Sequence, residues 1–144
     1  MTIRVANILD GKGRDVLTVT PESSVAALVK LLAEKRIGAV PVVDGAGKVR
    51  GIVSERDVVR ALAGDAAVLD RKVETLMTRE VQTCILGDTV ADLMEIMTRG
   101  RFRHLPVIDQ GKLIGIISIG DVVKQRVAEA QSEVDALTTY ITTS

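Results

Sequence analysis

Apolar residues recur with helical spacing in two separate stretches of the chain. One apolar face, with spacing i, i+3, i+4 and i+7, is repeated 65 residues later: Val25, Leu28, Val29 and Leu32, then Val90, Leu93, Met94 and Met97. This spacing predicts two amphipathic helices. Residues that favour helix N-termini precede each face, namely Ser23 or Ser24 in one stretch and Asp88 or Thr89 in the other.

The similarity continues downstream, so the repeat is longer than a helix. Residues 38–63 (GAVPVVDGAGKVRGIVSERDVVRALA) align with residues 103–128 (RHLPVIDQGKLIGIISIGDVVKQRVA). Upstream, residues 5–10 resemble residues 73–78 at an offset of 68, and the GKG stretch at 11–13 accounts for the three additional residues. The chain therefore contains an internal duplication.

Each copy predicts the element order β-α-β-β-α after a short helical lead-in. The strands are expected near residues 16–19, 39–43 and 49–54 in the first copy, and near 81–84, 104–108 and 113–118 in the second. The predicted fold class is α+β, or α/β, with two tandem repeats packed about a pseudo-twofold axis and a C-terminal helix. We expect the first repeat to span residues 1–66 and the second 67–128, with a tail at 129–144.

The tail carries apolar residues at alternating spacings of three and four: Val127, Ala130, Val134, Leu137 and Ile141. Two heptads of this pattern are compatible with an amphipathic helix that packs on its own module or on a second copy. They are also compatible with a coiled-coil seam between two copies. Both interpretations stay open at the level of sequence.

Composition excludes several classes of function. Nineteen basic residues balance nineteen acidic ones, and aromatic residues are almost absent, so neither an overall charge nor stacking surfaces favour nucleic-acid binding. No apolar run approaches the roughly 18 residues needed to span a membrane, and no signal-peptide pattern opens the chain. We therefore expect a cytoplasmic protein with no membrane insertion.

The candidate catalytic groups are few. One cysteine, Cys84, and one histidine, His104, supply neither a metal site nor a thiol catalytic pair, and no phosphate-binding glycine motif occurs. We expect no enzymatic activity, no metal and no catalytic cofactor.

Both copies place a serine three residues before an aspartate where the last strand meets the last helix. These pairs are Ser54 with Asp57 and Ser118 with Asp121. One interpretation is a capping box, in which the two side chains satisfy free N–H groups at the helix N-terminus. The other is a ligand site, because a carboxylate there can accept the two vicinal hydroxyls of a ribose while the helix N-terminus favours phosphate oxygens.

The sequence resembles paired cystathionine β-synthase-type (CBS) domains, also called Bateman modules. The resemblance rests on the combination of VPVVD, GKVRGIVSERDVV, LPVID and GKLIGIISIGDVV with the lead-in LTVTPESSV. The resemblance covers about residues 1–128. It implies a regulatory, signal-transducing or energy-sensing module that binds AMP, ADP, ATP, NAD(H) or S-adenosylmethionine in two clefts between the repeats. It implies that such a ligand is regulatory rather than catalytic.

The resemblance also implies roles for individual residues. Asp57 and Asp121 would hold ribose hydroxyls, and Ser54 and Ser118 would contact ribose or phosphate. The remaining implied contacts line the clefts or face the base: Ile37, Gly38, Ile52, Ile116, Arg14, Val16, Thr78 and Val81. Arg103 and His104 are the expected phosphate ligands. Because the first copy has Gly38 and Ala39 at those positions, the two sites are expected to differ.

The alternative is a ligand-free dimerisation or interaction module, or a separate regulatory subunit of an enzyme or transporter. The expected partners are thus an adenosine-containing small molecule, a second copy of the chain in a homodimer, and an effector protein.

Overall fold

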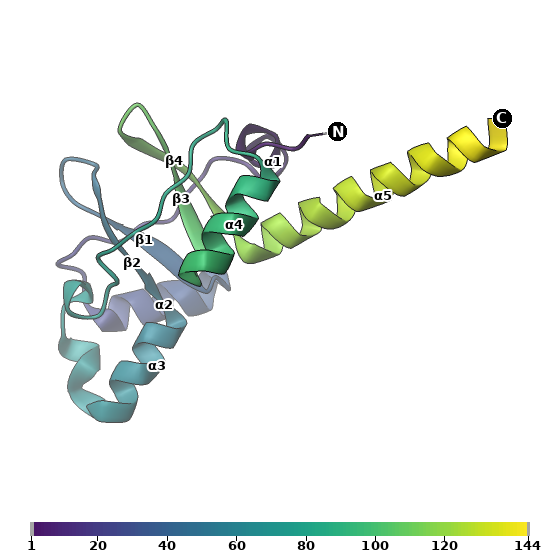
Figure 1. Cartoon of the computed structure of the whole chain (residues 1–144). Helices are drawn as coiled ribbons and strands as arrows, with labels where there is room; N and C mark the ends of the chain where they lie inside the picture. The colour runs from purple at the N-terminus through teal and green to yellow at the C-terminus, as the bar shows by residue number, and fades with distance from the viewer. Residues whose placement is uncertain (1, 144) are drawn as a thin grey trace. The chain divides into compact units, whose positions relative to one another are not determined.

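The computed structural model describes residues 2–143, which divide into two compact units. One unit comprises residues Asp15–Val81 together with Gln110–Leu113. The other comprises the described residues up to Arg14, Gln82–Asp109 and the described residues from Ile114 onward. Figure 1 shows the elements of each unit. We call them the β1–β2 unit and the β3–β4 unit.

The β1–β2 unit contains a two-stranded antiparallel sheet covered by helices. Helix α2 (Val25–Lys35) leads to β1 (Ala39–Val43) and β2 (Val49–Ser54), and α3 (Glu55–Gly64) and the 3-10 turns η1 (Ala66–Asp70) and η2 (Val73–Thr75) follow. Ser24 caps α2, its hydroxyl accepting from the Ala27 N–H at 3.1 Å. The apolar face predicted for residues 25–32 is buried in this core, which also contains Val40, Val42 and Val53.

The β3–β4 unit repeats this arrangement. Helix α4 (Val90–Gly100) precedes β3 (His104–Asp109) and β4 (Lys112–Ser118), which form a second two-stranded sheet, and α5 (Ile119–Thr143) follows. Thr89 caps α4 in a full capping box with Asp92. The core includes Val90, Leu93, Leu105 and Ile117. The predicted fold class is therefore confirmed as a mixed helix and strand structure with two repeats and a C-terminal helix.

The first predicted strand of each copy is reduced to a single bridge. Val19 bridges Val42, and Cys84 bridges Val107, each in parallel orientation. In these bridges the Pro41 carbonyl oxygen accepts a hydrogen bond from the Val19 N–H, and the Pro106 carbonyl oxygen accepts one from the Cys84 N–H. A proline cannot donate a ladder hydrogen bond, so each contributes only the acceptor that its position requires.

The lead-in segments pack with the opposite copy, which the repeat pattern did not predict. Helix α1 (Val5–Lys12) lies in the β3–β4 unit, where Val5 N–H donates to the Asp88 carbonyl at 2.9 Å. The equivalent bond in the β1–β2 unit runs from the Val73 N–H to the Ser23 carbonyl at 2.8 Å. Each unit is therefore assembled from one copy and the lead-in of the other.

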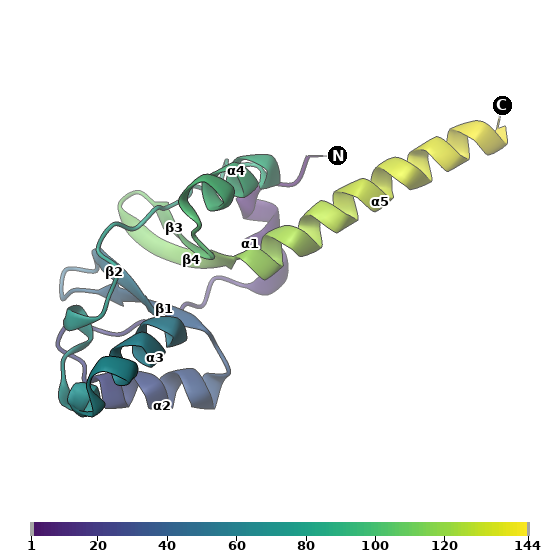
Figure 2. The same ribbon diagram turned by 60° about the horizontal axis from the view of Figure 1, so that its bottom comes forward.

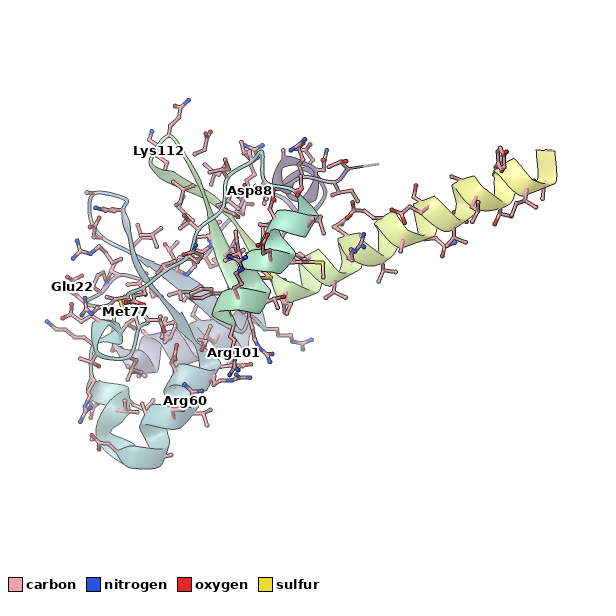
Figure 3. The ribbon with its side chains drawn as sticks, viewed as in Figure 1. Glu22, Arg60, Met77, Asp88, Arg101 and Lys112 are labelled. Atoms are coloured by element: carbon pink, nitrogen blue, oxygen red, sulfur yellow. The ribbon has the colours of Figure 1, made fainter. Side chains whose placement is uncertain are left out.

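Glycines at the centre of the last strands admit these exchanged segments. A Cβ atom on Gly51 would lie 2.8 Å from the Met77 sulfur and 2.8 Å from the Thr78 carbonyl oxygen. Met77 is labelled in Figure 3. A Cβ on Gly115 would lie 2.8 Å from a Leu9 methyl group. At Gly51 the backbone oxygen leaves no room for a Cβ, and at Gly115 a Cβ would displace the Leu9 side chain, so the repeated glycine has a packing role in both units.

The predicted closing helix and tail form one continuous helix, α5, of 25 residues (Figure 2). Near its start, Val122 is buried in the core of the β3–β4 unit. Farther along, its large apolar residues are exposed: Val127, Val134, Leu137, Tyr140 and Ile141. Among residues 2–143, no helix is both long enough and apolar enough to cross a membrane.

Candidate functional site

The Ser54–Asp57 pair forms a capping box where β2 runs into α3. The Asp57 N–H donates to Ser54 Oγ at 3.3 Å, and Asp57 Oδ2 accepts from the Ser54 N–H at 2.8 Å and from the Ser54 hydroxyl at 3.1 Å. The Glu55 N–H, also free at the helix start, donates to the Gly38 carbonyl at 2.9 Å. The first turn of α3 is thereby satisfied by local groups.

The Ser118–Asp121 pair repeats this geometry at the junction of β4 and α5. Asp121 Oδ2 accepts from the Ser118 N–H at 2.9 Å, and Ser118 Oγ accepts from the Asp121 N–H at 3.1 Å. The Ile119 N–H donates to the Arg103 carbonyl at 2.8 Å, as Glu55 does to Gly38. Both predicted sites therefore have the same backbone framework.

A cation distinguishes the second site from the first. Lys12, the last residue of α1, places its Nζ 2.6 Å from Asp121 Oδ2 and 2.9 Å from the Ile116 carbonyl oxygen. Burial raises the pKa of Asp121, but the hydrogen bonds from Lys12 and the Ser118 backbone outweigh it and leave that pKa below its usual range. Asp57 forms no ion pair among the described residues.

His104 begins β3 and lies in the electrostatic field of the same cluster. Burial lowers the pKa of the imidazole, and the Lys12 charge lowers it further; Asp121 opposes this shift, and Arg103 adds to it. The lowered pKa favours the neutral imidazole, which can donate a hydrogen bond without adding a charge. Lys12 supplies positive charge at this junction, and the Arg103 charge acts on His104.

The structure distributes the other predicted site residues between the two units. The β1–β2 unit, which contains the Asp57 junction, also contains Ile37, Gly38, Ile52, Val16, Thr78 and Val81. The β3–β4 unit, which contains the Asp121 junction, also contains Arg14, Arg103, His104 and Ile116. Thr78 meets the site strand directly, because it exchanges two backbone hydrogen bonds with Ile52, at 2.8 and 3.0 Å. The exchange of lead-ins therefore pairs Thr78 with the strand that ends at the Asp57 junction. It also places Arg14 in the unit that contains the Asp121 junction.

Each junction leaves one carboxylate oxygen available. All of the hydrogen bonds that Asp57 and Asp121 accept reach Oδ2, and Oδ1 of each accepts none from residues 2–143. The half-buried carboxylates are accessible in part. A carboxylate held this way by its helix is oriented in advance and can still accept hydroxyl donors through Oδ1.

Capping by itself does not identify a ligand site, because α4 carries the same box. Thr89 and Asp92 make the reciprocal bonds at 2.9 and 3.1 Å, at a junction for which the sequence predicts no ligand. The two glycine-containing junctions differ from it because each lies where a strand of a sheet ends and a helix begins.

Sequence reasoning missed Lys12. The available signal was the GKG stretch, the three residues by which the first lead-in exceeds the second. Positive φ at Gly13 (95°) ends α1 directly after Lys12. The insertion therefore extends the helix end to the position from which Lys12 contacts Asp121.

Residues 2–143 contain few other reactive or metal-binding groups. Burial raises the pKa of the Cys84 thiol to about 12, so it remains protonated at neutral pH. No cluster of three or more His, Cys, Asp or Glu side chains that could hold a metal occurs within residues 2–143. A hollow of about 330 Å³ in the β3–β4 unit is lined by Gln82, Glu95, Ile96, Arg99, Gly100 and Phe102, and none of these belongs to the Ser–Asp junctions.

The chain belongs to the CBS-domain family. The CBS domain model matches residues 12–64 and again residues 73–128, one match for each copy. A CBS domain pair is a regulatory module, and no catalytic family model is among these matches.

Solved structures of CBS-domain proteins have the same fold. The CBS-domain protein ATU1752 from Agrobacterium tumefaciens is 52% identical, with a TM-score of 0.82 over 87% of this chain and 93% of that one. The CBS domain pair of protein MJ0100, in complex with 5′-methylthioadenosine and S-adenosyl-L-methionine, is 25% identical with a TM-score of 0.80, covering 90% and 99%. CBSX2 in complex with AMP is 26% identical with a TM-score of 0.73, covering 89% and 98%.

Proposed function

We propose that this protein binds adenosine-containing ligands at its Ser–Asp junctions and, when bound, regulates a separate effector protein. The observation that carries the proposal is that, at the end of a sheet strand in each unit, Asp57 and Asp121 are anchored through Oδ2 while Oδ1 accepts no hydrogen bond from residues 2–143. A vicinal diol supplies two hydroxyl donors, which suits a pre-oriented carboxylate. Ser54, Ser118 and the adjacent helix N-termini supply polar groups for ribose or phosphate oxygens.

Related proteins support this ligand class. The structure of MJ0100 contains 5′-methylthioadenosine and S-adenosylmethionine, and that of CBSX2 contains AMP. The compounds share the adenosine group and differ at the 5′ position. A ligand that favours one of two conformations of the module would change the surface that it presents to the effector.

The test is a thermal-shift screen with AMP, ADP, ATP, NAD, NADH and S-adenosylmethionine, followed by calorimetry. A ligand at one hundred times its Kd stabilises the folded state by about 2.7 kcal/mol, enough to raise Tm by several degrees. Asp57→Ala with Asp121→Ala is expected to weaken binding at least tenfold.

Asp92→Ala is the matched control, because it removes the same capping carboxylate from α4. It should lower stability by about 1 kcal/mol and leave ligand affinity unchanged. Unchanged affinity in the double variant, or affinity lost equally in the control, would refute the assignment of Asp57 and Asp121. In that case the two pairs serve only as helix caps.

We further propose that the protein forms a homodimer through the distal part of α5. Val127, Val134, Leu137 and Ile141 are more than half exposed and follow heptad spacing on one side of the helix. Figure 3 shows side chains projecting along the length of α5. A second copy presents the same seam, so pairing would bury the apolar residues of both helices.

Light scattering after size-exclusion chromatography tests this proposal. Leu137→Lys with Ile141→Lys places charges in the seam and should convert dimer to monomer. Ala128→Lys with Ser132→Lys adds the same charge on the opposite side of the helix and should leave the dimer intact. A monomeric wild type, or equal behaviour of the two double variants, would contradict a seam on α5.

A further inference from the structure

Lys12 is held at the Asp121 junction by two hydrogen bonds. Its ammonium donates to Asp121 Oδ2 at 2.6 Å and to the Ile116 carbonyl at 2.9 Å. The side chains of Lys12 and Asp121 are 35% and 23% exposed, so solvent screens the pair only in part. An ammonium has three donors, and the third makes no hydrogen bond to residues 2–143.

The Asp57 junction lacks such an ion pair within residues 2–143. No Lys or Arg pairs with Asp57 among the described residues, and the Glu55 carboxylate lies beside Gly38, with Oε1 3.7 Å from where a Cβ on that glycine would be. At the Asp121 junction Ile119 and Gly120 take the places of Glu55 and Arg56, and Arg103 takes the place of Gly38. The two junctions therefore share a backbone framework and differ in charge.

This difference has a consequence for the group attached to the ribose. A diol that binds Asp121 would bring its 5′ substituent close to the Lys12 ammonium, which has one free donor. A phosphate at that position would accept the free N–H and gain charge-assisted attraction. An uncharged thioether would gain neither, and a sulfonium would meet a like charge.

We propose that Lys12 makes the Asp121 site selective for adenosine ligands that carry a 5′-phosphate over uncharged or cationic 5′-thio analogues. The inference rests on the proposed function, since it assumes that a ribose binds Asp121. The Asp57 site, which has Glu55 and no paired cation, would lack this selectivity. A side chain from the exchanged lead-in would thus give different ligand preferences to two sites that share a backbone framework.

Calorimetry with AMP, 5′-methylthioadenosine and S-adenosylmethionine tests this selectivity on the full chain. Asp57→Ala isolates the Asp121 site, and Lys12→Met is then introduced into that background. We expect the isolated site to prefer AMP at least tenfold over both thio compounds, and Lys12→Met to weaken AMP binding about tenfold. Affinity for 5′-methylthioadenosine should change less than threefold.

Two controls separate the charge of Lys12 from its packing. Lys12→Arg retains the charge and should retain the preference for AMP. This variant still tests the role of the charge if the methionine variant fails to fold. Lys48→Met removes an exposed lysine of the β1–β2 turn and should change nothing. Asp121→Ala isolates the first site, where AMP and 5′-methylthioadenosine should bind with similar affinity.

Different outcomes test the selectivity of the Asp121 site and the binding of adenosine ligands in general. If Lys12→Met leaves the ratio of AMP to 5′-methylthioadenosine affinity unchanged, the inference is overturned while adenosine binding stands. If Lys12→Met strengthens all three ligands equally, Lys12 is a competitor for Asp121 and selectivity by charge is overturned. If wild type binds none of the three compounds, the proposed function fails together with the inference.

Discussion

Identical short motifs acquire different electrostatic properties in the two halves of this chain. Ser54–Asp57 and Ser118–Asp121 form capping boxes with closely similar distances, because a capping box depends only on residues three apart. Among the described residues, only the second pair has a cation bound to it, because Lys12 forms an ion pair with Asp121. The sequence predicted both Ser–Asp pairs and the expectation that the two sites differ, but not this ion pair.

His104 makes stability depend on pH in a defined window. Its pKa in the folded protein is lowered, chiefly by burial and then by Lys12, so below about pH 6.5 the unfolded chain binds a proton that the folded chain resists. Folding stability should therefore fall as pH drops from 6.5 toward the lowered pKa. The slope for one proton cannot exceed about 1.4 kcal/mol per pH unit.

Urea denaturation between pH 5 and 8 measures this dependence. His104 is the single histidine of the chain, so His104→Gln should flatten the curve in that window. Asp121, whose folded pKa is lowered, loses its stabilising contribution only as pH falls below about 3.8. Parallel curves for wild type and His104→Gln between pH 5 and 6.5 would show that the histidine does not carry the effect.

At the scale of elements, periodicity predicted the helices better than the strands. The apolar faces of residues 25–32 and 90–97 became α2 and α4, with Ser24 and Thr89 as their caps. The first strand of each copy was overestimated, because VLTV and VQTC have strand-like composition but only Val19 and Cys84 make bridges. Strand composition alone does not determine how many residues pair.

The glycine repeated at the centre of the last strand of each copy is a point of close approach to another segment of the chain. Gly51 faces the Met77 side chain and the Thr78 carbonyl oxygen, and Gly115 faces the Leu9 side chain. Which segment fills the space depends on tertiary packing. The repeat alone does not identify the segment that approaches each glycine.

At the scale of the whole molecule, the exchange of lead-ins makes each unit depend on both halves of the chain. Leu9 is 1% exposed and belongs to the core that contains Leu105 and Ile117, far along the sequence. Leu9→Ala should lower the free energy of unfolding by about 2–5 kcal/mol. The loss should appear first in the β3–β4 unit.

Native-state hydrogen exchange locates that loss. Leu9→Ala should reduce protection of the Ile108 amide, which donates to Cys84, more than that of the Val43 amide, which donates to Val19. Leu28→Ala, in the core of the β1–β2 unit, is the matched control and should show the reverse order. Equal loss at both amides in both variants would mean that the units open together.

The sequence by itself determined the duplication, the helix faces, the caps and the two Ser–Asp junctions. These features depend on residues within a few positions of one another, and local geometry is encoded locally. Only the tertiary structure decided which lead-in packs with which copy, because the two lead-ins carry similar apolar patterns and either would fit by pattern alone. It likewise decided the pairing of Lys12 with Asp121, since these residues are 109 positions apart and meet only through the packing of α1 in the β3–β4 unit.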